Sequence, residues 1–88
     1  MKMYASILLV AALGASCAAK TECTTEDRSR WQDEGAFQKK LAEEGFQIEK
    51  FEVTDGNCYE IYGWDRDRRK VEIYFNPVDG TKVKEEVH

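Results

Sequence analysis

The fold is decided by residues 58–75, CYEIYGWDRDRRKVEIYF, where two runs of alternating apolar and polar side chains flank a charged turn at residues 65–68. Successive side chains of a strand point to opposite faces, so each run predicts a strand with one apolar side. Pairing the two strands across the turn sets Ile61 near Ile73 on that side. The stretch therefore predicts an antiparallel hairpin with one buried face.

A helix is predicted upstream, from Glu34 to Glu44. The carboxylate of Asp33 can accept hydrogen bonds from the first backbone amides of this helix, which have no partner within it. Phe37 and Leu41 lie four residues apart and form a narrow apolar stripe. Gly45 follows the last helical residue and suits a left-handed C-terminal cap.

The remaining strands are shorter. The apolar residues of 48–53 slip by one position, which predicts a β-bulge near Glu49 and Lys50. Asp55-Gly56 predicts a hairpin turn, and a lysine-rich edge strand is expected from Thr81 to Lys84. Together these elements predict an α+β fold: one helix packed on a small antiparallel β-meander of three to four strands.

Residues 1–19 have the order of a secretory signal peptide, namely a basic residue, an apolar core at 7–13 and small residues up to Ala19. Cleavage is expected after Ala18 or Ala19. A short buried helix and an uncleaved membrane anchor are alternatives, but the core is shorter than the roughly 20 residues that span a bilayer. A third alternative is a lipoprotein acylated at Cys17, although Gly14 stands where such signals usually carry leucine.

The chain is accordingly divided into a signal peptide at 1–19, an extended arm at 20–30 and a single domain at 31–88. Export leaves one pair of cysteines, Cys23 and Cys58, in an oxidising compartment, and this predicts a disulfide. Metal binding by two free thiols is the alternative, but the sequence has no Cys-x-x-Cys motif. The expected location is periplasmic or secreted.

The charge balance argues against nucleic acid as a partner. The chain carries 13 basic and 17 acidic side chains, a net charge of −4, and loss of the leader with its single Lys2 leaves −5. A phosphate backbone attracts basic surfaces. No membrane association is expected unless Cys17 is lipidated, and a monomer is predicted.

Three segments carry a resemblance to the PepSY domain, a small module of secreted metallopeptidase propeptides and of stand-alone exported proteins. They are the helix ending in EEGF at 43–46, the hairpin VTDGNCYEI at 53–61, and VEIYFNPVDG at 71–80. The resemblance spans most of residues 31–84. It implies a binding module that inhibits, chaperones or regulates peptidases and has no catalytic residues. Arg68 departs from the pattern, because relatives often place glycine in that turn.

The residues themselves predict no catalytic, cofactor or metal site. The only histidine is His88, so the chain lacks the base and orienting group of a hydrolytic triad. Asp65 and Asp67 resemble the start of a calcium loop, but such a loop needs several further oxygen ligands, and arginines flank these two. The alternative, a solvated turn, is favoured.

One surface is a candidate for binding a protein partner. Strand alternation puts five aromatic and acidic side chains on the sheet face away from the apolar core. These residues are Glu60, Tyr62, Trp64, Glu72 and Tyr74. Two other interpretations compete with a docking surface: the disulfide-tied arm covers this face, or the aromatics pair across strands only for stability.

The predicted function is a non-catalytic exported interaction module, with a peptidase as the candidate target of inhibition or regulation. The alternative is a structural protein of the cell envelope, with or without a lipid anchor at Cys17, that has no peptidase target.

Overall fold

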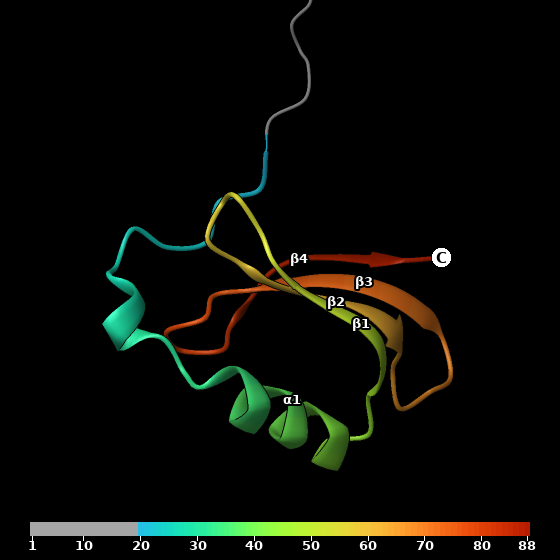
Figure 1. Ribbon diagram of the computed structural model, residues 1–88. Helices are drawn as coiled ribbons and strands as arrows, with labels where there is room; N and C mark the ends of the chain where they lie inside the picture. Colours follow the sequence, from blue (N-terminus) through green and yellow to red (C-terminus); the bar gives the residue numbers. More distant parts are fainter. Residues whose placement is uncertain (1–19) are drawn as a thin grey trace, which may run out of the picture.

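The computed structural model describes residues 20–88, so the predicted signal peptide and the alternative of acylated Cys17 lie outside the described residues. The described chain forms one short 3₁₀-helix, one α-helix and four strands (Figure 1). They are η2 (Arg28–Arg30), α1 (Glu34–Glu43), β1 (Gln47–Val53), β2 (Tyr59–Trp64), β3 (Lys70–Phe75) and β4 (Lys82–Val87). Within residues 20–88, no helix is long and apolar enough to cross a membrane.

Both ends of α1 are capped as its sequence predicts. Asp33 Oδ2 accepts a hydrogen bond from the backbone N–H of Ala36 at 2.9 Å. At the other end, Gly45 adopts a φ of 105°, in the left-handed region, and the backbone N–H of Phe46 donates to Leu41 O at 3.1 Å. This arrangement satisfies carbonyl groups that the last turn of a helix leaves unpaired.

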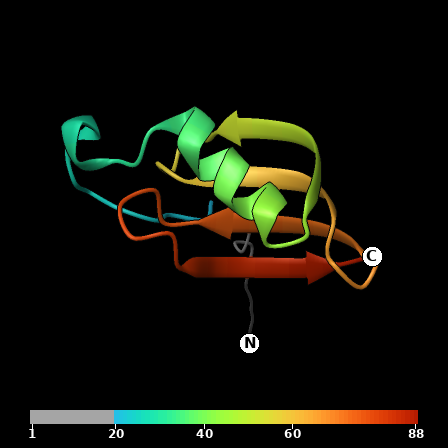
Figure 2. The ribbon, with the colours of Figure 1, turned by 90° about the horizontal axis from the view of Figure 1, so that it is seen from below.

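The four strands form one antiparallel sheet in the order β1-β2-β3-β4, so each strand pairs with its neighbour in sequence. Ile61 lies opposite Ile73, and the register of β1 shifts between Ile48 and Lys50. The predicted pairing and the predicted bulge are therefore confirmed. Viewed from below, α1 lies diagonally across the sheet while β4 runs along one side, away from the helix (Figure 2).

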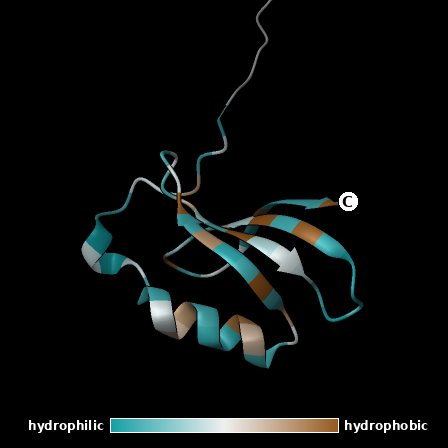
Figure 3. Cartoon of the chain, turned by 45° about the vertical axis from the view of Figure 1, so that its right-hand side comes forward, coloured by the Kyte–Doolittle hydropathy of each residue, from teal (hydrophilic) through white to brown (hydrophobic). Residues whose placement is uncertain are grey.

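The core lies between α1 and one face of the sheet, and apolar residues alternate with hydrophilic ones along the strands (Figure 3). Burial of these side chains is the main favourable term that holds helix and sheet together. The buried cluster consists of Phe37, Leu41, Tyr59, Ile61, Val71, Ile73 and Phe75. The fold class predicted from the sequence is confirmed.

The arm is tied to the β1–β2 hairpin by the predicted disulfide, with the two sulfur atoms of Cys23 and Cys58 2.09 Å apart. The backbone N–H of Cys23 also donates to Gly56 O at 3.0 Å. A Cβ atom built on Gly56 would meet Thr21 O, so a larger residue would push the arm away. Glycine in this hairpin serves the close approach of the arm, whereas the positive φ of the turn, 61°, falls on Asn57.

Two boundaries differ from the predicted ones. The end of the arm forms η2 instead of continuing extended, because Asp27 caps the backbone N–H of Ser29 and Trp31 N donates to Arg28 O. The predicted edge strand from Thr81 to Lys84 is instead β4, which continues to Val87. An edge strand has one side in solvent and tolerates the charged residues Glu85 and Glu86 in its second half.

Candidate functional site

The five predicted surface residues share the sheet face that points away from α1, here called the outer face. The register arranges this face in three rows that run across the strands. The rows are Glu52, Glu60, Tyr74 and Lys84; then Lys50, Tyr62, Glu72 and Glu86; then Gln47, Trp64 and Lys70, with His88 beside Lys70. The strand phase predicted from alternation is therefore right.

Each of the three aromatic side chains of the outer face lies under the ammonium group of a lysine on a neighbouring strand. Lys50 Nζ is 5.4 Å from the ring centroid of Tyr62, and the corresponding distances are 5.8 Å for Lys70 over Trp64 and 5.7 Å for Lys84 over Tyr74. All three are directly opposed pairs across strands, and such pairs stabilise a sheet. The outer face therefore presents partly buried aromatic rings together with lysine ammonium groups.

Glu60 is not exposed as a docking residue would be: only 3% of its surface is accessible. It lies on the inner strand β2, directly opposite Glu52 of β1 and Tyr74 of β3. Its Oε2 atom has no hydrogen-bond partner among the described residues. Burial, together with the neighbouring Glu72 carboxyl, raises the pKa of Glu60 to about 6.

Glu72 is the ionised partner of this carboxyl pair. A hydrogen bond with Glu60 is the main cause that holds the pKa of Glu72 below its ordinary value. The hydroxyl of Tyr74 donates to Glu72 Oε2 at 3.1 Å. The pKa of Tyr74 is raised, chiefly by burial, and the pKa of Tyr62 is raised, chiefly by its hydrogen bond with Glu60. Below pH 6 the proton of the pair therefore resides on Glu60.

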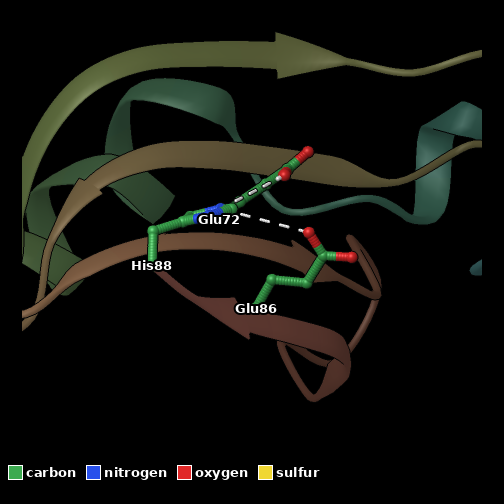
Figure 4. Close-up of side chains that lie close together, drawn as sticks. All are labelled: Glu72, Glu86 and His88. Carbon is green, nitrogen blue, oxygen red and sulfur yellow. Dashed lines mark ion pairs between the residues drawn. The ribbon is translucent and has the colours of Figure 1, made fainter.

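A second group of side chains meets at the β4 side of the outer face (Figure 4). His88 Nε2 lies 3.8 Å from Glu72 Oε1 and 4.0 Å from Glu86 Oε1. The sequence interpretation missed this group because His88 looked isolated and β4 was expected to end at Lys84. Extending the strand alternation to the end of the chain would have placed Glu86 and His88 on one face.

An open cavity of about 610 Å³ lies at the hairpin end of the outer face. The arm contributes Lys20 and Thr21 to its wall, and the outer face contributes residues that include Glu60, Tyr74 and Lys84. The arm therefore borders the outer face at this end, which agrees in part with the interpretation that it covers the face. The remaining walls come from the β1–β2 hairpin, residues 52–56.

In the Asp65–Arg68 turn, residues 66–68 are exposed, as the sequence favoured, whereas Asp65 at its start is buried. Asp65 is 8% exposed, and its carboxylate accepts hydrogen bonds from the backbone N–H groups of Asp67 and Arg69, both at 2.9 Å. The Arg69 guanidinium also pairs with it at 2.8 Å. The backbone hydrogen bond of Arg69 is the main cause that lowers the pKa of Asp65. This carboxylate organises the turn, and its oxygens are already engaged.

Comparison with protein families decides the relationship that the three segments suggested. A family model described as peptidase propeptide and YPEB domain, or PepSY, matches residues 3–86. The chain belongs to this family. The match covers nearly the whole PepSY chain, whereas comparisons with curated proteins and with solved structures found no match.

The family of this PepSY chain and its disulfide both fit the same cellular location. The family is described by propeptides, which are binding modules and not catalytic ones, and the Cys23–Cys58 bridge fits an extracellular or periplasmic location. Arg68 adopts a φ of 67° in the β2–β3 turn of the PepSY domain. The turn keeps a conformation that suits glycine although it carries arginine.

Proposed function

We propose that the mature chain is an exported, non-catalytic interaction module that binds a protein partner through its outer face, and that a secreted or periplasmic peptidase is the partner it inhibits or regulates. Export by the signal peptide at residues 1–19 is part of the proposal. Membership of a family described by peptidase propeptides supports the class of partner.

The observation that carries the proposal is the composition of the outer face. Aromatic rings and arginine or lysine groups contribute much of the binding energy at protein interfaces when they lie together and exclude water. Here Tyr62, Trp64 and Tyr74 lie on one face of the sheet, each beside a lysine. The helix covers the opposite face, so the outer face is the broad sheet surface left for a partner.

The rigid position of this face supports the proposal further. Its residues stand on four paired strands, and the disulfide fixes the hairpin that closes one end. Side chains on paired strands lose little additional freedom on binding, which favours affinity.

The direct test titrates the purified disulfide-bonded protein against metallopeptidases from the same extracytoplasmic space. Turnover should fall as the protein reaches micromolar concentration, and a binding measurement should give a matching Kd. Unchanged turnover and absent binding across those peptidases would reject the peptidase part of the proposal.

Variants then locate the surface. Trp64→Ala should weaken binding by about 2 kcal/mol, roughly thirtyfold in Kd, as expected for an aromatic anchor. Lys39→Ala on the solvent side of α1 is the matched control and should leave Kd unchanged, because Lys39 is exposed and remote from the outer face. If the control weakens binding and Trp64→Ala does not, the helix side is the interface instead.

A further inference from the structure

The group at the β4 side of the outer face combines two carboxylates and one imidazole. The donor atoms of Glu72, Glu86 and His88 all lie within 4.8 Å of one another. Carboxylate oxygens and imidazole nitrogen are the groups that bind divalent transition-metal ions in proteins.

The two carboxylates are already oriented toward the imidazole. Tyr74 donates its hydroxyl proton to Glu72 Oε2 at 3.1 Å, and Lys84 Nζ pairs with Glu86 Oε2 at 3.3 Å. In both residues the other oxygen, Oε1, is the one that faces His88 Nε2 (Figure 4). Partners of this kind hold metal ligands in position and strengthen binding.

The backbone fixes the same three residues. Glu72 and Glu86 are directly opposed on the neighbouring strands β3 and β4, and the backbone N–H of His88 donates to Lys70 O at 2.8 Å. Ligand atoms around a tetrahedral zinc ion lie about 3–3.5 Å apart, given metal–ligand bonds of about 2.0–2.2 Å. His88 Nε2 lies 3.8 and 4.0 Å from the two glutamate oxygens. Side-chain rotation alone can shorten these distances to those of a zinc site.

A cation would also relieve an unfavourable contact. Two glutamates directly opposite each other on adjacent strands repel, and this pairing is ordinarily avoided. Lys84 offsets the charge of Glu86, but it pairs with Oε2 and not with the Oε1 atom that faces His88.

From these contacts we propose that Glu72, Glu86 and His88 bind one divalent transition-metal ion, with Zn²⁺ as the preferred ion. Three protein ligands leave a fourth position for water or for a donor from a second molecule. Ca²⁺ and Mg²⁺ are disfavoured, because Ca²⁺ needs six to eight oxygen ligands and Mg²⁺ needs octahedral oxygen geometry. The proposal does not depend on a peptidase partner.

The test measures Zn²⁺ binding by calorimetry at pH 7.5, using disulfide-bonded protein produced for export and purified without a histidine tag. One ion should bind per chain. His88→Ala and Glu86→Gln should each weaken binding by at least about a hundredfold, more than loss of an outer-shell partner. Glu85→Gln removes the same charge from the same strand but faces the opposite side of the sheet, opposite Ile73, and should leave the affinity unchanged.

Spectroscopy gives an independent measurement on the unaltered protein. The chain has a single histidine, so its imidazole proton resonances belong to His88 and should shift on addition of Zn²⁺. Tyr74→Phe should weaken binding by about tenfold while the resonances still shift, since it removes only the hydrogen bond that orients Glu72. Absence of binding, or equal affinity in wild type and His88→Ala, would overturn the proposal.

Discussion

Glu60 shows how one buried carboxyl can make the outer face sensitive to pH. It lies on the central strand with 3% of its surface exposed, beside a second carboxyl, Glu72. Burial disfavours the charged form, and a neighbouring negative charge disfavours it further. The folded protein therefore holds a proton on Glu60 at pH values where the unfolded chain has already released it.

The sign of the effect on stability follows from proton binding. The unfolded chain releases the Glu60 proton near the ordinary pKa of 4.5, and the folded chain releases it near 6. Across that window the folded state binds more protons, so the free energy of unfolding decreases as pH rises. Glu72, whose pKa is lowered, acts in the opposite sense but below pH 4.5.

Glu60→Gln tests this, because glutamine mimics the protonated side chain at every pH. We expect the variant to be more stable than wild type above pH 6, by about 1–2 kcal/mol from the pKa difference. The gap should close near pH 4.5. Urea unfolding at a series of pH values measures it, with Glu43→Gln on α1 as a control. A variant whose stability changes with pH as steeply as that of wild type would contradict the assignment.

Residue positions predicted from the sequence succeeded where local chemistry decides and failed where packing decides. Asp33 at the N-terminus of α1 and Gly45 after its end depend on backbone groups a few residues away, so the sequence is sufficient. The burial of Glu60 depends on side chains from two other strands and could not be read from alternation.

At the scale of elements, the β2–β3 turn is the connection under most backbone strain. Arg68 adopts a φ of 67°, and a side chain in the left-handed region costs roughly 1–2 kcal/mol. The turn persists because Asp65 anchors it through the backbone N–H groups of Asp67 and Arg69. A positive φ is a conformation that glycine adopts at little cost and arginine does not.

Arg68→Gly should therefore stabilise the protein, by about 0.5–1 kcal/mol after allowing for the greater freedom of glycine in the unfolded chain. Thermal unfolding measures the change. Arg66→Gly is the control in the same turn: Arg66 has no positive φ, and its guanidinium donates to Glu44 O at 3.1 Å. That variant should destabilise, and a stabilisation by both substitutions would show that strain at Arg68 is not the cause.

Element boundaries were predictable to the extent that apolar periodicity marks them. The spacing of apolar residues predicts the helix, the paired strands β2 and β3 and the bulge in β1. The strand β4 was predicted too short because its second half is charged, and η2 was missed because three residues held by one aspartate carry no periodic pattern. The β4 error concealed the candidate metal ligands.

At the scale of the whole molecule, the disulfide joins an arm without regular strand structure to the sheet. The arm packs on the hairpin through the Cys23–Gly56 hydrogen bond and through Asn76 Nδ2, which donates to Cys23 O at 3.2 Å. A chain of this size buries little apolar surface relative to the entropy it loses on folding. A covalent link is accordingly a large part of its stability.

Replacing both cysteines, Cys23→Ser with Cys58→Ser, should lower the free energy of unfolding by about 3–4 kcal/mol, as expected for a bridge across some 35 residues. The arm should also loosen, because Cys58 is fully buried and serine at this position cannot form the covalent link to residue 23. Denaturant unfolding measures the loss, and a reductant supplies the internal control: it should bring wild type down to the level of the variant and leave the variant unchanged. Equal midpoints for oxidised wild type and the variant would mean that the sheet and its single helix hold the fold without the link, and the dependence of this small domain on an oxidising compartment would then be wrong.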